Sequence, residues 1–381
     1  MSDRYLPYGR QSVSAEDVAA VAEALESDYL TTGPAVAAFE AGLARACGSR
    51  HAVAVSSGTA ALHAAYFAAG LGPGDEIVTS PLTFAATANA ALYLGAAVRF
   101  VDVDPEHGLL DPEAARAAVG PRTRLIVGVD YAGQPADYAA LGRLAADREL
   151  TVVADAAHSL GATRDGGPAG SLAHLSATSF HPVKLLTTAE GGAVTTDDDD
   201  AAARARRFRS HGFEYDLARM EEPEGPWSQE MHDLGFNYRL SDVHSALGLS
   251  QLRRLDAFVA RRRELAERYR SELADLAALR LPAEAPGVRS AWHLFVVRVA
   301  DAARRRPFFE RLRGLGLGVQ VHYRPVYLHP YYRRLGFRPG LCPVSEDFYS
   351  RCLSLPLYPG LTDDDAASVV ERVRRAARET L

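Results

Sequence analysis

The chain has few cysteines, no long apolar run and no excess of basic charge. Its three cysteines, Cys47, Cys342 and Cys352, are scattered, lack metal-ligand spacing and are too few for a disulfide framework. No apolar run approaches the roughly 18 residues that span a bilayer, and the N-terminus has no signal-peptide core. We therefore expect a cytoplasmic protein with no membrane contact and no metal site.

The charge balance excludes another class of function. The formal net charge is -6, whereas a general nucleic-acid binder needs a basic face. We expect no nucleic-acid partner, and local groups must hold any anionic ligand. The 381 residues suggest two or three domains at about 150 residues each, with 48% apolar and 24% charged residues as in ordinary globular proteins.

Apolar strands alternate with helices over the first two thirds of the chain. This pattern predicts an α/β fold with a mostly parallel sheet covered on both faces. Ligands on such sheets bind beyond the carboxyl ends of the strands. Polar and aromatic residues follow directly after several predicted strands: Ser57, Phe84, Tyr131, Asp155, His158 and Lys184.

The sheet-like pattern stops near residue 255. We expect a large domain at 1–254, including an extended N-terminal arm, and a smaller α+β domain at 255–381. The first predicted helix starts at Ser14 and has an apolar face, and the polar segment 210–235 reads as an exposed excursion. In the smaller domain, 318–322 is predicted as a strand and 342–353 as a helix. The residues of the first helix's apolar face are Val18, Val21, Ala22 and Leu25.

Ser57-Gly58-Thr59 lies between a strand (51–55) and a helix (60–69). Glycine lets the backbone approach a ligand, and the free N–H groups and dipole of a helix N-terminus favour an anion. Simple N-capping by Ser57 or Thr59 explains the same residues. The motif alone leaves a phosphate site and a helix cap both open.

Lys184 lies on an otherwise uncharged, apolar loop between two predicted core strands, 176–180 and 193–196. A buried ammonium is desolvated, so it tends to lose its proton and become a nucleophile for carbonyl groups. A surface lysine whose head reaches water is the alternative. Asp155 ends another apolar strand and suits either a turn or cap, or a pairing with a pyridinium N–H. Phe84 and His158 can flank such a ring or belong to the core.

Together these residues resemble the DegT/DnrJ/EryC1/StrS family of sugar aminotransferases, from Tyr8 to about Pro356. The family implies the aspartate-aminotransferase fold (pyridoxal-phosphate-dependent transferase fold type I), with a seven-stranded, mostly parallel sheet flanked by helices and a smaller C-terminal domain. The residues that carry the resemblance are Lys184 with Ser179, Ser57-Gly58-Thr59, Asp155-Ala-Ala-His158 and Asn237-Tyr-Arg239.

The resemblance implies a role for each matching residue. Lys184 would form the Schiff base with pyridoxal 5'-phosphate (PLP) and shuttle the proton, while Asp155 would keep the pyridine nitrogen protonated. Ser57, Gly58, Thr59 and Ser179 would hold the phosphate, and Phe84 and His158 would sandwich the ring, with His158 counted among the catalytic residues. Asn237 would reach the phosphate of a neighbouring subunit, which implies a homodimer with shared sites. Contacts to the nucleotide sugar would come from Tyr8, Asp28, Tyr29, Leu30, Thr31, Gly58, Ser179, Arg239, Gln320, Val321, His322 and Tyr323.

Within the family, the run Ser-Phe-His-Pro-Val-Lys (179–184) followed by Thr-Thr-Ala-Glu-Gly-Gly-Ala-Val (187–194) is similar to the pseudaminic-acid branch. That branch implies amino transfer from L-glutamate to C4 of UDP-2-acetamido-2,6-dideoxy-β-L-arabino-hexos-4-ulose, through pyridoxamine phosphate. Another UDP- or dTDP-linked 3- or 4-keto-6-deoxy sugar is the alternative. A non-catalytic PLP-binding regulator is a second one, although the chain has no spare length for a DNA-binding domain. A sugar 3-dehydratase would carry histidine in place of Lys184.

Overall fold

The computed structural model describes residues 4–381, and its centre is a mixed sheet. Within these residues, seven strands form that sheet, and β10 alone runs in the direction opposite to the other six. The predicted seven-stranded, mostly parallel sheet is therefore confirmed. In spatial order the strands are β2 (His51–Val55), β10 (Gly192–Thr196), β9 (Leu175–Ser179), β6 (Thr151–Asp155), β5 (Thr123–Val129), β3 (Glu76–Thr79) and β4 (Ala97–Phe100).

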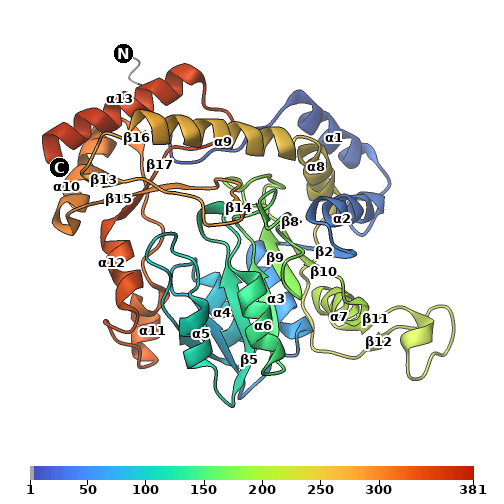
Figure 1. Cartoon of the computed structure of the whole chain (residues 1–381). Helices are drawn as coiled ribbons and strands as arrows, with labels where there is room; N and C mark the ends of the chain where they lie inside the picture. Colours follow the sequence, from blue (N-terminus) through green and yellow to red (C-terminus); the bar gives the residue numbers. More distant parts are fainter. Residues whose placement is uncertain (1–3) are drawn as a thin grey trace.

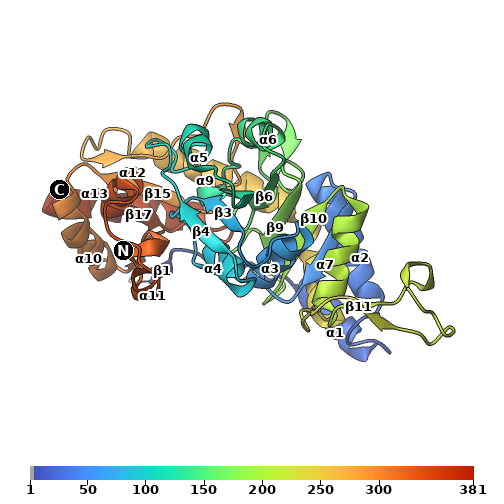
Figure 2. The ribbon, with the colours of Figure 1, turned by 90° about the horizontal axis from the view of Figure 1, so that it is seen from below.

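Side chains of the central strands alternate between two apolar layers. In β5, Leu125 and Val127 pack against the layer that contains α3, whereas Ile126 faces the layer that contains α6. Both faces are thus buried, which is why these strands read as continuous apolar runs. Figures 1 and 2 show the helices on the two faces of the sheet. The helices of this part are α1 (Ala15–Glu26), α2 (Pro34–Cys47), α3 (Gly58–Ala68), α4 (Ala86–Tyr93), α5 (Pro112–Ala118), α6 (Tyr138–Ala146), α7 (Asp199–Arg209) and α8 (Asp242–Leu252).

The C-terminal part has its own apolar cluster around a three-stranded antiparallel sheet. Leu6 of the N-terminal arm is buried in this cluster. The boundary at residue 254 stays a prediction, and α9 begins at Leu255. The elements are β13 (Leu279–Arg280), β15 (Phe295–Val299) and β17 (Cys352–Leu355), with α9 (Leu255–Glu272), α10 (Arg305–Gly314), α11 (Pro330–Arg334), α12 (Pro343–Arg351) and α13 (Asp363–Thr380).

Two predicted elements of the C-terminal part are wrong. The strand expected at 318–322 is only β16 (Leu317–Gly318), which pairs with β1 (Leu6–Pro7) of the arm. The helix expected at 342–353 ends at Arg351, and Cys352 begins a strand of the sheet. Both errors arise because pairing with segments distant in the sequence determines where these strands and helices begin and end.

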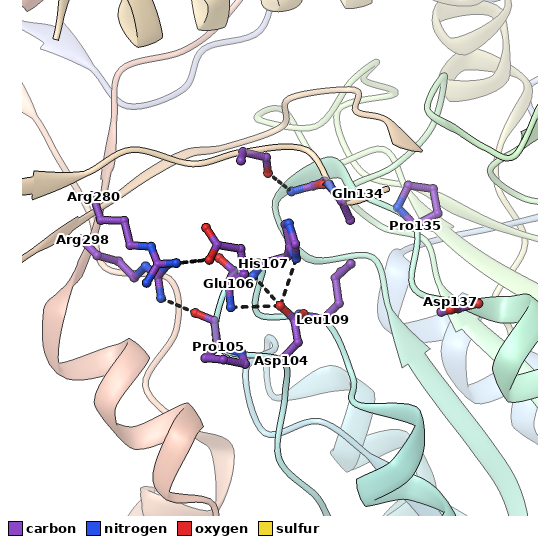
Figure 3. A network of polar contacts seen from close by, with 12 residues as sticks. Asp104, Pro105, Glu106, His107, Leu109, Gln134, Pro135, Asp137, Arg280 and Arg298 are labelled. Atoms are coloured by element: carbon purple, nitrogen blue, oxygen red, sulfur yellow. Dashed lines mark hydrogen bonds and ion pairs between the residues drawn. The ribbon is translucent and has the colours of Figure 1, made fainter. Parts of the chain in front are cut away.

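Polar contacts connect the C-terminal three-stranded sheet to the loop 104–109 (Figure 3). Arg298 donates from Nη1 to Pro105 O (2.5 Å) and from Nη2 to Glu106 O (3.1 Å), and Arg280 pairs with the Glu106 carboxylate. Asp104 accepts the backbone N–H of His107 at 2.7 Å, which fixes the shape of the loop. Two further short sheets are β14 (Val288–Arg289) with β7 (Thr163–Arg164) and β8 (Gly167–Pro168), and β11 (Phe213–Glu214) with β12 (Glu230–Met231).

The segment between β11 and β12 projects from the body in both ribbon views, as predicted for an exposed excursion (Figures 1 and 2). The helix predicted to begin at Ser14 is confirmed as α1, which the Ser14 side chain caps. Its predicted apolar face is open to solvent in the single chain, with Val18 61% and Leu25 58% exposed, whereas Asp17 and Ala24 are buried. Every helix in the described part of the chain is too short or too polar to cross a lipid bilayer.

Candidate active site

A cavity of about 340 Å³ lies at the carboxyl ends of the central strands. Ser57 follows β2, Asp155 ends β6 and Ser179 ends β9, so a cavity lies at the strand ends where the sequence predicts the site. The N-terminal arm and the segment after β16 close the other side. The lining comprises Tyr8, Ser57, Gly58, Thr59, Leu62, Thr83, Phe84, Ala86, Val129, Asp155, Ala157, His158, Ser179, His181, Val183, Lys184, Glu190, His322 and Tyr323.

Lys184 lines this cavity and lies on the loop between β9 and β10, which backbone hydrogen bonds hold in place. The backbone N–H of Lys184 donates to His181 O (2.8 Å), and Thr188 N–H donates to Phe180 O (3.0 Å). Burial lowers the pKa of the Lys184 ammonium from 10.5 to about 8, and the Asp155 carboxylate opposes that shift. The unprotonated fraction of the amine near neutral pH is therefore far larger than for an exposed lysine, and this form can act as a nucleophile or base.

Amine labelling of the apo-protein tests this environment. Lys184 is the only lysine in the sequence, so mass spectrometry of its peptide reports one side chain. Since only the neutral amine reacts with an acylating reagent, labelling should rise with pH and reach its midpoint at about 8. Asp155→Asn removes the charge that raises the pKa, so its midpoint should lie at lower pH. A wild-type midpoint near 10.5 contradicts the burial of the amine.

Asp155 faces the cavity from the end of β6 and is 6% exposed. Its Oδ2 accepts a hydrogen bond from the Thr87 hydroxyl (2.5 Å), and its Oδ1 accepts one from Ala157 N–H (3.3 Å). Burial raises the pKa of Asp155 above its usual value, and the bonds from Thr87 and Ala157 and the Lys184 charge oppose that rise. Those partners favour the ionised form, which can pair with a cationic ring N–H.

The Ser57-Gly58-Thr59 motif at the start of α3 both caps the helix and forms a cradle suited to a phosphate. The Ser57 hydroxyl accepts Ala60 N–H at 3.1 Å and so caps the helix. Gly58 faces Ser179 so closely that a Cβ on Gly58 would lie 2.7 Å from the Ser179 Cβ. The first N–H groups of a helix have no intrahelical acceptor, so this cradle of Gly58, Thr59 and Ser179 fits a phosphate.

Four imidazoles line or back the cavity: those of His158, His181, His322 and His293. His158 accepts or donates a hydrogen bond with the Tyr323 hydroxyl at 3.1 Å, and its ring lies 4.3 Å from that of His293. The buried Nδ1 atoms of His158 and His293 have no hydrogen-bond partner among the described residues. Burial and the Lys184 charge lower the pKa values of His158 and His322, the latter to about 3, so both rings are neutral.

The phosphate cradle, the buried carboxylate and the Lys184 amine lie in one cavity, and this set fits PLP. Sequence reasoning missed the lining residues Thr83, His181 and Glu190, and the backing residue His293. His181 and Glu190 lie on the same loop as Lys184, so that loop was the available signal. Tyr131, which also follows a strand, does not line the cavity and instead donates to His322 O (2.5 Å).

Some predicted substrate and cofactor contacts lie outside the cavity of the single chain. The segment 237–241 runs beside the end of β2, where Tyr238 O accepts Ser56 N–H at 2.7 Å. Ser241 in turn bridges to Thr31. The roles assigned to these residues stay predictions. The residues outside the cavity are Asp28, Tyr29, Leu30, Thr31, Asn237, Arg239, Gln320 and Val321.

Comparison with known proteins gives a consistent result. The profile of the "DegT/DnrJ/EryC1/StrS aminotransferase family" matches residues 11–374. The chain is 39% identical to the Bacillus subtilis "Spore coat polysaccharide biosynthesis protein SpsC" over 98% of this chain and 97% of that protein.

Two solved structures are similar over almost the whole chain. "Helicobacter pylori PseC, aminotransferase involved in the biosynthesis of pseudoaminic acid" has a TM-score of 0.92 and 30% identity, covering 99% of this chain and 100% of that one. The PLP form of "Putative sugar aminotransferase Spr1654 from Streptococcus pneumoniae" has a TM-score of 0.92 and 27% identity, again covering 99% and 100%.

Proposed function

The chain belongs to the DegT/DnrJ/EryC1/StrS aminotransferase family, and from that premise we propose that it aminates a UDP-linked 4-keto sugar. It is a PLP-dependent sugar transaminase. The proposed acceptor is UDP-2-acetamido-2,6-dideoxy-β-L-arabino-hexos-4-ulose, aminated at C4, and the proposed donor is L-glutamate. The product would be UDP-4-amino-4,6-dideoxy-N-acetyl-β-L-altrosamine. The similarity in sequence and fold to PseC supports this acceptor.

One observation carries the transaminase chemistry of the proposal: the Lys184 amine, the Asp155 carboxylate and the Gly58–Ser179 cradle surround one cavity. PLP, when bound there, supplies an electron sink for the charge left when a proton leaves the donor carbon. We assign its phosphate to Ser57, Gly58, Thr59 and Ser179, and its ring nitrogen to Asp155.

The residues of the chain then do the remaining work. Lys184 Nζ takes a proton from the donor carbon and returns one during amination of the acceptor, which its near-neutral pKa permits. Phe84, 62% exposed at the cavity mouth, and buried His158 are assigned to the two faces of the ring. Tyr8 and the residues 320–323 are assigned to the sugar, because Tyr8, His322 and Tyr323 line the cavity.

We also propose a homodimer in which Asn237 reaches the partner's phosphate. Asn237 lies outside the cavity of its own chain, in a segment with exposed apolar side chains, including Leu234 at 83% and Phe236 at 40%. The open face of α1 adds further apolar surface. Burial of these groups against a second copy would explain why they are apolar.

A second acceptor is favoured by a different observation. The 39% identity to SpsC, which is named for spore coat polysaccharide biosynthesis, is the reason to keep another UDP- or dTDP-linked 3- or 4-keto-6-deoxy sugar as the second candidate. Both candidates share the chemistry of the cavity and differ only in the acceptor. The fold and the assigned residues are therefore common to both.

A single-turnover experiment separates the acceptors. The PLP-loaded protein is converted with L-glutamate and freed of donor, and UDP-4-keto-6-deoxy sugars of the L-arabino and D-xylo series are added separately. Fast return of the starting absorbance with the L-arabino sugar alone supports the proposal. Return with the D-xylo sugar alone contradicts the proposed acceptor and keeps the transaminase. If neither sugar reacts, the acceptor is a 3-keto sugar or a dTDP-linked sugar.

A further inference from the structure

Two threonine hydroxyls, those of Thr83 and Thr87, form a hydroxyl relay that ends at the Asp155 carboxylate. Thr87, in the first turn of α4, is fully buried, and Thr83, just before that helix, is 3% exposed. The two hydroxyl oxygens are 2.6 Å apart, and Thr87 Oγ1 is 2.5 Å from Asp155 Oδ2. Thr83 lines the cavity, whereas Thr87 does not. Thr87 therefore acts only through its neighbours.

The direction of the two bonds follows from proton counting. An ionised Asp155 can only accept, so Thr87 must give its single hydroxyl proton to Oδ2. Thr87 Oγ1 then accepts a hydrogen bond from the Thr83 hydroxyl. Thr87 has no second hydroxyl proton to donate to Phe84 O, which lies 3.2 Å from Oγ1. The only arrangement consistent with an ionised carboxylate runs from Thr83 to Thr87 to Asp155.

Hydrogen bonds also fix the backbone of Thr87. Tyr66 of α3 donates its hydroxyl to Thr87 O at 2.9 Å, and Tyr66 is itself fully buried. Thr87 N–H donates to Phe84 O at 3.3 Å, which completes the first turn. The hydroxyl of Thr87 is thus held at Oδ2 by the surrounding fold and needs no ordering when a ligand binds.

We propose that Thr87 is a positioning residue that holds the Asp155 carboxylate ionised and aimed at the ring nitrogen of PLP, with Thr83 orienting the Thr87 hydroxyl. The Thr87 bond occupies one acceptor site of Oδ2, and a carboxylate has further acceptor sites for a ring N–H. This inference rests on the PLP site of the proposed function. Its specific content is that the Thr87 hydroxyl is coupled to the ring nitrogen and to no other part of the cofactor.

Two ligands isolate that coupling in binding experiments with the apo-protein. One is PLP, and the other is its carbon analogue, in which C–H replaces the ring nitrogen while the aldehyde and the phosphate stay the same. Dissociation constants are measured for wild type, Thr87→Val and Thr87→Ser. Valine removes the hydroxyl with little change of shape, and serine keeps it.

Loss of a hydrogen bond to a charged group should weaken PLP binding by Thr87→Val about 10- to 100-fold. Binding of the carbon analogue should be unchanged, and Thr87→Ser should match wild type with both ligands. Equal weakening of both ligands by Thr87→Val would show a purely structural role and overturn the inference, as would no weakening of either. Failure of wild type to bind PLP would instead contradict the proposed function.

Discussion

Lys184→Arg should lower the rate of transamination by at least about 10⁴-fold, the upper end of what positioned proton transfer supplies. Arginine keeps the positive charge, but its guanidinium has a pKa above about 12 and cannot give up a proton at neutral pH. The variant has no lysine at all, since Lys184 is the only one in the sequence. The measurement is the conversion of L-glutamate to 2-oxoglutarate with a keto-sugar acceptor.

A second variant serves as the control for the amine itself. Arg306→Lys places a lysine on the exposed surface of α10, where the Arg306 side chain is 85% exposed. Arg306→Lys should be as active as wild type, and the double variant with Lys184→Arg should be as inactive as Lys184→Arg alone. Activity of Lys184→Arg within tenfold of wild type would remove Lys184 from the chemistry.

The next largest effect is expected from Asp155→Asn, with a rate about 10²- to 10³-fold below wild type, as for other losses of preorganised charge stabilisation. The amide keeps the shape of the carboxylate and its acceptor oxygen for Thr87, but it cannot hold the negative charge that a cationic ring N–H needs. Steady-state rates of wild type and variant, both saturated with PLP, measure the effect.

Asp137→Asn is the matched control. Asp137 caps a helix, which is the role that Asp155 would have if it were purely structural. Its side chain accepts Ala140 N–H at 3.0 Å at the start of α6, and asparagine caps equally well. This variant should keep the wild-type rate. If Asp155→Asn also keeps that rate, Asp155 is structural and the assigned charge pairing is wrong.

Local patterns predicted the sheet and the place of the site because both depend on short stretches of sequence. The apolar runs of β5 and β6 place side chains in both apolar layers, so they are recognisable from the strands alone, and Asp155 and Ser57 follow directly from strand ends. The unusual apolar loop around Lys184 was readable for the same reason. The absence of any other lysine was an additional signal that the pattern analysis did not use.

Contacts between distant segments explain the failures. Leu317–Gly318 is a strand because Leu6–Pro7 pairs with it, and Cys352 continues into β17 because β15 lies beside it. His293 reaches His158 through a turn that buried Arg262 holds by donating to Trp292 O and His293 O, each at 3.3 Å. No local pattern carries that information, because the arginine lies about 30 residues away from the turn.

The central claim is that this cavity converts an amino donor by using PLP and Lys184. The most direct test is to mix the purified, PLP-loaded protein with L-glutamate alone and measure 2-oxoglutarate after removal of the excess donor. The account predicts a stoichiometric yield of 2-oxoglutarate per bound cofactor and a simultaneous loss of the visible absorbance. Protein that binds PLP fully but forms no 2-oxoglutarate and keeps its absorbance would contradict the account.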